Sequence, residues 1–135
     1  MTDSVLAPDI FDRLRQATAN SPGVLAELCR DYVSEARITI DQIRIALAGN
    51  DAVALRERAH YLKGSSMMIG AKALSQYCAT LEQMGRDSEI ETAGPIVTGA
   101  AEALKAVEAE LARELGPIVL PAANPGEPPG GPIPA

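Results

Sequence analysis

The stretch Leu55–Arg86, LRERAHYLKGSSMMIGAKALSQYCATLEQMGR, contains two patterns of inward-facing residues separated by a glycine. Each pattern repeats every three or four residues, which is the spacing of one face of an α-helix. The positions are Leu55, Ala59, Leu62, Ser66 and Ile69 in the first pattern and Leu74, Cys78 and Leu81 in the second. Gly70 follows the first pattern, where glycine commonly ends a helix. We therefore expect two antiparallel helices, the second from about Ala71 to Met84.

The same spacing predicts further helices on both sides of this hairpin. They are Pro8–Thr18 with Ile10, Phe11 and Leu14 inward, Val24–Leu47 with Leu25, Leu28, Cys29, Tyr32, Ala36, Ile40, Ile43 and Leu47 inward, and Pro95–Leu115 with Val97, Ala101, Leu104, Val107, Leu111 and Leu115 inward. Ser21 is the expected N-cap of the long helix, Gly49 its end, and Asp51 the N-cap of the helix that follows.

Four long amphipathic helices with short connections predict an all-α fold, an up-down-up-down antiparallel four-helix bundle with a short extra N-terminal helix laid across it. Aliphatic residues supply the core, since 47% of the chain is hydrophobic and only 3% is aromatic. We assign the bundle to residues 1–116. Residues 117–135 are rich in proline and glycine and are expected to form a disordered tail, inert rather than a docking peptide.

Composition excludes several classes of function. The net charge of −6 argues against nucleic acid as a partner, because phosphate backbones call for clustered cations. No apolar run is long enough to span a membrane, and the N-terminus lacks the pattern of a signal peptide. Cys29 and Cys78 stand alone, which indicates buried thiols in a reducing compartment rather than a disulfide or a metal site. We expect a cytoplasmic protein.

His60 is the only histidine of the chain. At about 100° per residue it lies about 140° from the centre of the inward stripe, so it is expected to face solvent. Arg56, Lys63 and Met67 lie on the same flank. Gly64 lies opposite the core, where glycine costs about 1 kcal/mol relative to alanine. Its benefit would be space beside the imidazole, and a tolerated surface glycine or a helix kink is the structural alternative.

The second helix of the hairpin supplies partners for this histidine. With the turn centred near Ala71, residues whose numbers sum to about 142 lie at one level of an antiparallel pair. His60 is then level with Glu82, and Arg56 with Arg86. A carboxylate at Glu82 would accept the proton of one ring nitrogen and leave the other as a nucleophile. The structural alternative for Glu82 is an ordinary solvated charge.

These residues fit a carrier of phosphoryl groups. A solvent-facing neutral imidazole is a competent nucleophile near neutral pH. Lys63 would neutralise phosphoryl oxygens on the ring and Ser65 would add a hydrogen bond, whereas Ser66 is expected to pack inward. Lys63, Arg86, Arg56 and Lys72 would give a local positive field. The sequence contains no nucleotide-binding glycine motif, so nothing indicates transfer from ATP.

A docking surface is also expected near the histidine. Ile38 and Ile45 point away from the core stripe of the long helix, close to the level of His60, and suit a transient interface. The alternative is that the short N-terminal helix covers them. Met67, flexible and exposed, is the better candidate for partner contact.

Residues Ala59–Arg86 closely resemble the histidine-containing phosphotransfer (HPt) domains of multistep His–Asp phosphorelays. The matching positions are His60, Leu62, Lys63, Gly64, Ser65, Gly70, Ala71, Leu81 and Glu82. A weaker resemblance extends over roughly residues 8 to 115. The proline-rich tail has no place in the family pattern.

The resemblance implies that His60 accepts phosphate from an aspartyl phosphate of one receiver domain and donates it to the aspartate of another response regulator. Lys63 would steady the phosphohistidine, Gly64 would give clearance, and Glu82 stands where the family often has glutamine or another polar residue bonding the imidazole. No cofactor is implied, because Mg²⁺ would belong to the receiver. The expected docking residues are Arg56, Met67, Arg86, Ile38 and Ser65.

The implied partners are receiver domains of response regulators and of a hybrid histidine kinase, without nucleic acid or membrane. We expect a monomer, because four helices in one chain already close a core. Two alternatives remain. A non-transferring helical module would sequester a receiver or kinase, and a kinase dimerisation hairpin would have an acidic residue after the histidine, where Tyr61 stands here.

Overall fold

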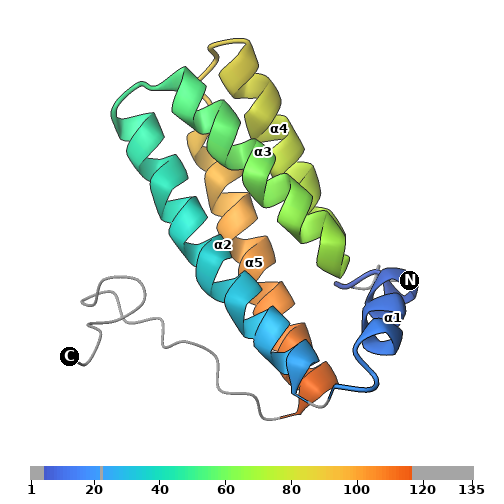
Figure 1. The fold of residues 1–135 in the computed structure, drawn as a ribbon. Coiled ribbons are helices and arrows are strands. Elements are labelled where there is room, and N and C mark those ends of the chain that lie inside the picture. The colour runs from blue at the N-terminus through green and yellow to red at the C-terminus, as the bar shows by residue number, and fades with distance from the viewer. Residues whose placement is uncertain (1–4, 22, 117–135) are drawn as a thin grey trace, which may run out of the picture.

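The computed structural model describes residues 5–21 and 23–116, and the predicted tail at 117–135 lies outside them. These residues form five α-helices and no strand: α1 (Pro8–Ala17), α2 (Val24–Ala48), α3 (Ala52–Ile69), α4 (Lys72–Arg86) and α5 (Gly94–Leu115). Helices α2 to α5 run alternately up and down as an antiparallel bundle, and α1 lies at one end of it (Figure 1). The predicted fold class is therefore confirmed.

The core is built from the stripes that the sequence pattern predicts for the central hairpin. Every one of those positions is buried: Leu55, Ala59, Leu62, Ser66, Ile69, Leu74, Cys78 and Leu81. The buried Val33 and Ile43 of α2 and Val107 and Leu111 of α5 belong to the same cluster. Since helix faces with this spacing exclude water only against one another, packing rather than helix propensity supplies most of the stability.

Leu28 is an exception to the predicted core, because its residue surface is 44% exposed. The hydrogen bond of 2.7 Å between the hydroxyls of Tyr32 and Ser66 sets the register between α2 and α3. At about 100° per residue, Leu28 points about 100–140° away from Cys29, Val33 and Ile40, which are buried. It therefore lies on the flank of the inward face, and its predicted burial is wrong.

The helix ends follow the predicted signals with one correction. Asp51 caps α3, since its carboxylate accepts a hydrogen bond of 3.0 Å from the Ala54 amide, and Gly49 ends α2. The predicted Ser21 cap of α2 is wrong. The N-cap is Gly23, which has a φ of 88° and offers no side-chain oxygen to the helix.

Helix α1 covers the end of the bundle at which α3 turns into α4. The Ala7 amide donates a hydrogen bond of 2.8 Å to the carbonyl of Gly70, and Gly70 has a φ of 86°. A Cβ at Gly70 would lie 3.0 Å from the Ala7 nitrogen. Phe11 is buried, and Arg15 bridges to Glu114 of α5 at 2.5 Å. The α3–α4 turn therefore needs glycine both for its conformation and for this contact.

The two cysteines are free and buried, as expected. Burial raises the pKa of the Cys78 thiol to about 12 and that of Cys29 to about 11. Both therefore remain protonated and act as small apolar core residues.

Helices α3 and α4 pack closely at Gly85. A Cβ there would lie 2.7 Å from the Arg56 backbone nitrogen and 2.8 Å from the Ala52 carbonyl oxygen. Neither backbone atom can move without shifting α3. Gly85 therefore sets how closely the two helices pack, one turn of α4 beyond Glu82.

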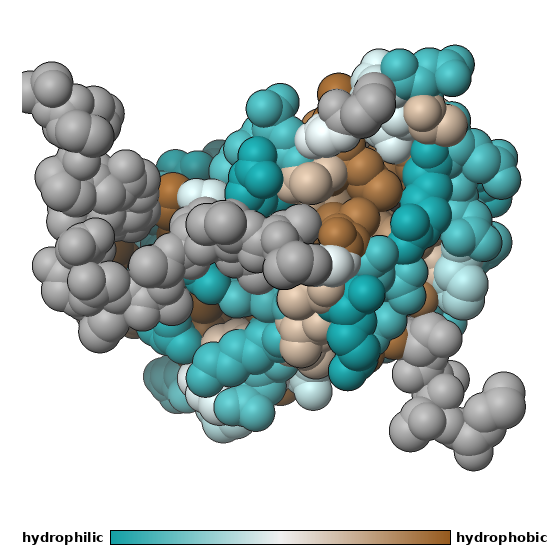
Figure 2. Space-filling model, turned by 90° about the horizontal axis from the view of Figure 1, so that it is seen from below, coloured by the Kyte–Doolittle hydropathy of each residue, from teal (hydrophilic) through white to brown (hydrophobic). Residues whose placement is uncertain are grey.

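The end of the bundle at which α1 lies exposes apolar as well as hydrophilic side chains (Figure 2). Seen from below, onto the end where α1 lies, brown apolar atoms are exposed among teal hydrophilic ones (Figure 2). Among the described residues no helix combines the length and the hydropathy that a bilayer span requires.

Two glycine-to-alanine substitutions are expected to change stability in opposite directions. Gly85→Ala introduces a methyl group against the α3 backbone and should lower the free energy of unfolding by about 1–3 kcal/mol. Gly64 has nothing within 4 Å of a built Cβ, so Gly64→Ala should raise that free energy by up to about 1 kcal/mol through helix propensity. Urea unfolding followed by circular dichroism measures both, and a stabilised Gly85→Ala variant would contradict the tight contact.

Candidate functional site

His60 lies in the middle of α3 on its outward face, where its side chain is 69% exposed. The neighbouring Ala59 and Leu62 point into the core and are fully buried. Because the helix is anchored by these neighbours, the imidazole projects from a rigid element while its ring stays in contact with solvent. The predicted solvent-facing orientation is confirmed.

A buried glutamate on α4 contacts this imidazole. The Nδ1 atom of His60 lies 2.9 Å from Oε2 of Glu82, as the hairpin register predicts. Only 7% of the Glu82 side chain is exposed, so it is not an ordinary solvated charge. Lys63 reaches Oε1 at 2.6 Å, and Arg86 reaches Oε2 at 3.1 Å. The carboxylate is thus the centre of a cluster with three nitrogen partners.

The hydrogen bond from the Lys63 ammonium holds the pKa of the Glu82 carboxyl below its usual range, against the opposing effect of burial, and the bond with His60 adds to the lowering. An ionised carboxylate only accepts hydrogen bonds. The Nδ1 atom of His60 is therefore the protonated nitrogen of the neutral ring, and Nε2 keeps its lone pair on the exposed side. This arrangement fixes the tautomer that a nucleophilic Nε2 needs.

The residues that follow His60 on α3 divide between the site and the core. Gly64 is exposed, and none of the atoms that the structure describes would lie within 4 Å of a Cβ built there, so this position leaves open space one turn from the imidazole. The Ser65 hydroxyl is half-buried and donates to the Leu62 carbonyl at 3.2 Å. Ser66 is buried against Tyr32 and faces away from the histidine, as expected.

The predicted positive field is smaller than expected. Arg86 is 56% exposed and Arg56 is half-buried, with its backbone against Gly85 as the hairpin register predicts. Lys72 does not join them. It begins α4, a rise of about 15 Å from Glu82 along the axis, because each residue advances a helix by about 1.5 Å.

Large apolar side chains are exposed on α3, the helix of His60, and on the neighbouring α2. Met67 is 57% exposed, as predicted, while Ile38 on α2 is half-buried and Ile45 is 70% exposed. Ile45 lies in the last turn of α2, and α1 does not cover it, because α1 lies at the opposite end of the bundle (Figure 1). The other large exposed apolar residues of α3 are Val53, Tyr61 and Met68.

Tyr61 is a contact that the sequence analysis missed. Its hydroxyl donates a hydrogen bond to Glu35 of α2, which raises the pKa of the tyrosine. Counting back through the Gly49 turn would have identified the two residues as near neighbours. Consecutive residues of α3, His60 and Tyr61, are therefore tied to glutamates on opposite neighbouring helices.

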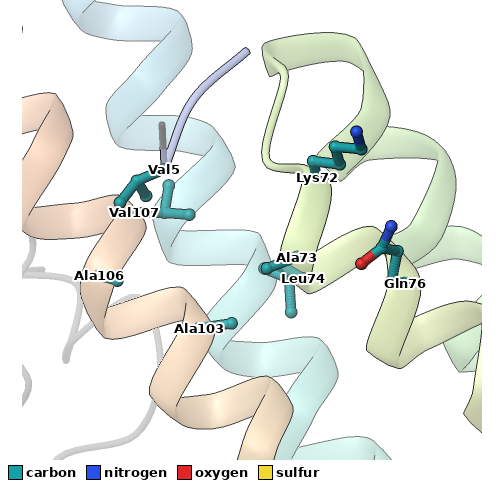
Figure 3. Close-up of a pocket in the computed structure, with 8 residues that line it drawn as sticks. All are labelled: Val5, Lys72, Ala73, Leu74, Gln76, Ala103, Ala106 and Val107. Atoms are coloured by element: carbon teal, nitrogen blue, oxygen red, sulfur yellow. The ribbon is translucent and has the colours of Figure 1, made fainter. Parts of the chain in front are cut away.

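A cavity of about 240 Å³ lies elsewhere, between α4 and α5 near the N-terminal segment. Figure 3 shows its lining, which is mostly small and apolar: Val5, Lys72, Ala73, Leu74, Gln76, Ala103, Ala106 and Val107. It includes neither His60 nor Glu82. In the part of the chain that the structure describes, no group of three or more His, Cys, Asp or Glu side chains is placed to hold a metal ion.

Comparisons with known proteins agree on one family. A family model described as Hpt domain matches residues 27–113. The chain resembles the crystal structure of histidine-containing phosphotransfer protein B (HptB) from Pseudomonas aeruginosa PAO1, with 25% identity, a TM-score of 0.77, and coverage of 84% of this chain and 96% of that chain.

The fold also matches a chain in the co-crystal structure of the Saccharomyces cerevisiae histidine phosphotransfer signaling protein Ypd1 and the receiver domain of its downstream response regulator Ssk1. The identity is 16%, the TM-score is 0.71, and the match covers 87% of this chain and 99% of that chain. The search of curated proteins finds no match.

Replacing Glu82 by glutamine should destabilise the fold in a pH-dependent way. The Glu82 pKa is lowered in the folded chain, so its stabilisation is present above the unfolded pKa and is lost as pH falls through the folded pKa. Near neutral pH, Glu82→Gln should lower the free energy of unfolding by about 1–3 kcal/mol, because Lys63 loses its partner. Urea unfolding at neutral and acid pH should find this difference shrinking with acid.

The matched control is Glu89→Gln, which changes an exposed glutamate beyond the end of α4. It should alter the free energy of unfolding by no more than about 0.5 kcal/mol at either pH. A Glu82→Gln deficit of equal size at both pH values would contradict the charge-based origin.

Proposed function

This chain belongs to the Hpt domain family, and we propose that it is a phosphorelay intermediate whose phosphorylated residue is His60. It accepts a phosphoryl group from the aspartyl phosphate of one receiver domain and passes it to the aspartate of another response regulator. One observation carries the assignment: the imidazole is 69% exposed while its Nδ1 atom is bonded to a buried carboxylate. Nε2 is thereby left as an accessible nucleophile.

The transfer needs positioning and charge neutralisation more than covalent help from the protein. The Nε2 lone pair attacks phosphorus, a nitrogen–phosphorus bond forms, and the bond to the aspartyl oxygen breaks with its electron pair returning to the carboxylate. The open space above Gly64 accommodates the phosphoryl group. Lys63, one helical turn from His60, is within reach of its oxygens once it leaves Glu82.

We assign Mg²⁺ to the receiver and no ATP-dependent kinase activity to this chain. The whole sequence lacks a phosphate-binding glycine loop of the nucleotide-binding kind. The chain is thus a phosphoryl carrier that depends on its partners for both loading and discharge.

The partner surface that we propose surrounds His60. Met67 supplies a flexible apolar contact, Arg56 and Arg86 supply positive charge, and Ser65 and Ile38 lie at the margin. A mixed apolar and charged surface of this kind suits a partner that binds and leaves in every cycle. The partners are receiver domains of response regulators and of a hybrid histidine kinase.

The same proposal includes a cytoplasmic monomer that binds neither nucleic acid nor membrane. Support comes from two buried free cysteines, which fit a reducing compartment. The net charge of −6 opposes binding to a phosphate backbone. Within the described residues, a single chain closes its own helical core.

Incubation with a phosphorylated receiver should label this protein, and the label should be acid-labile and alkali-stable, as expected for phosphohistidine. His60→Gln should remove the label while leaving the circular dichroism spectrum unchanged, because the side chain is exposed. Retained labelling in this variant would refute the assignment. Receiver binding without phosphoryl exchange by the unmodified chain would instead favour a sequestering module.

Two substitutions next to His60 should slow transfer without unfolding the protein. Lys63→Ala removes the nearby cation and should reduce the transfer rate by about 10- to 100-fold. Gly64→Ala narrows the free space and should also slow transfer, although it stabilises the helix. Lys105→Ala, at an exposed position of α5, is the control. Quench-flow kinetics with one receiver measures all three, and unchanged rates would contradict both roles.

A further inference from the structure

We infer that Glu82 is a positioning residue that keeps the phosphorylated His60 ring protonated at Nδ1. It thereby keeps the phosphoryl group on Nε2 transferable at pH values where the ring would otherwise lose that proton. The inference rests on the proposed function, because it concerns the phosphorylated state of the same histidine.

The geometry gives Glu82 a single role toward the ring. Oε2 lies 2.9 Å from Nδ1, and the side chain is only 7% exposed, so water competes weakly for this contact. Lys63 and Arg86 pair with the two carboxylate oxygens. A carboxylate held in its ionised form has no hydrogen to donate, so the contact exists only while Nδ1 carries one.

Phosphorylation places a positive charge on the ring if the Nδ1 proton stays. The Nε2 lone pair forms the bond to phosphorus, and the leaving aspartate takes the electron pair of the bond that breaks. The product is then a phosphoimidazolium whose N–H faces the negative charge of Glu82. Opposite charges at this distance favour the charged form of a titratable group.

Discharge depends on that proton. When an aspartate oxygen of a receiver attacks phosphorus, the nitrogen–phosphorus bond breaks and its electron pair returns to Nε2. With Nδ1 protonated, the departing group is a neutral imidazole. Without the proton, the departing group is an imidazolate anion, which leaves far less readily. Glu82 therefore maintains the reactive form of the carrier.

The surrounding charges strengthen the dependence on Glu82. On α3, Lys63 and Arg56 are cations on the flank of His60, and Arg86 is a cation on α4; all three disfavour a protonated ring. Glu57, an exposed carboxylate one turn before His60, acts in the opposite direction from a solvated position. On α2, Glu35 is engaged by Tyr61. On α1, Arg15 is paired with Glu114 at the end of the bundle. Glu82 is thus the carboxylate that contacts the ring directly.

A glutamine at this position lacks both the charge and the restriction to accepting. Its carbonyl oxygen can accept from Nδ1–H, but its amide group can equally donate to an unprotonated Nδ1. The amide therefore gives no preference for the protonated ring. Glu82→Gln separates the effect of the charge from the effect of the side-chain shape.

The test loads the full chain chemically with phosphoramidate, so that no receiver is needed to phosphorylate it. Phosphorus NMR then follows discharge to one receiver between about pH 5.5 and 9, the range in which imidazoles titrate. The rate of discharge should fall at high pH in both proteins, and this fall is the alkaline limb of the pH–rate profile. In the unmodified chain the alkaline limb should lie about one pH unit or more above that of Glu82→Gln. Glu82→Asp should recover part of the displacement, and Glu89→Gln should leave the limb unchanged.

A second measurement covers the case in which Glu82→Gln fails to fold. Nitrogen-15 NMR of the phosphorylated, unmodified chain should find Nδ1 still protonated at about pH 8, above the range in which a free imidazole holds its proton. An unprotonated Nδ1 there, or coincident pH limbs for the unmodified chain and Glu82→Gln, would overturn the inference and leave the carrier function standing. Failure of His60 to take up or pass on a phosphoryl group would instead overturn the proposed function.

Discussion

The buried carboxylate of Glu82 is the interaction on which the arrangement of the site depends. A charge removed from water is costly unless it is paired and hydrogen-bonded. Here Lys63 and His60 of α3 and Arg86 of α4 lie within 2.6–3.1 Å of its two oxygens. Because two of these partners come from the neighbouring helix, sliding α3 by one turn along α4 would leave the carboxylate buried without them. The register of the hairpin is therefore held by the site as well as by the core.

Two glycines make this arrangement possible for opposite reasons. At Gly85 the missing side chain lets α3 approach α4 until the Arg56 backbone is in contact, which brings α3 close to Glu82. At Gly64 there is no such contact, and the missing side chain leaves the ring of His60 unobstructed on the solvent side. Each glycine weakens its helix by about 1 kcal/mol relative to alanine. At Gly85 this cost is offset by closer packing of α3 on α4, whereas at Gly64 the only benefit is access to the imidazole from solvent.

The position of His60 opposite Glu82 could be predicted from the sequence. The inward-facing residues of the two helices are clear from their spacing, and the single turn at Gly70 then fixes the register between them. The sequence pattern does not predict that Glu82 is buried. That depends on the separation of the helices, which Gly85 controls through a backbone contact that no periodic pattern encodes. The predicted burial of Leu28 is wrong for another reason. An apolar residue on the flank of a helix face still fits the spacing of three or four residues, and that spacing does not say how wide a face the neighbouring helices cover.

The position of Lys63 suggests how one cluster serves both the empty and the loaded carrier. In the structure the Lys63 side chain is 30% exposed and its ammonium is bonded to Glu82, so this cation is already paired in the empty site. A phosphoryl group on Nε2 would bring about two negative charges to the same face of α3 and compete for that ammonium. If Lys63 turned toward the phosphoryl oxygens, the charge of Glu82 would become available to the ring as the ring became cationic. The negative charge of the phosphoryl group and the positive charge of the ring would then both be compensated by movement of one flexible side chain, without movement of a helix.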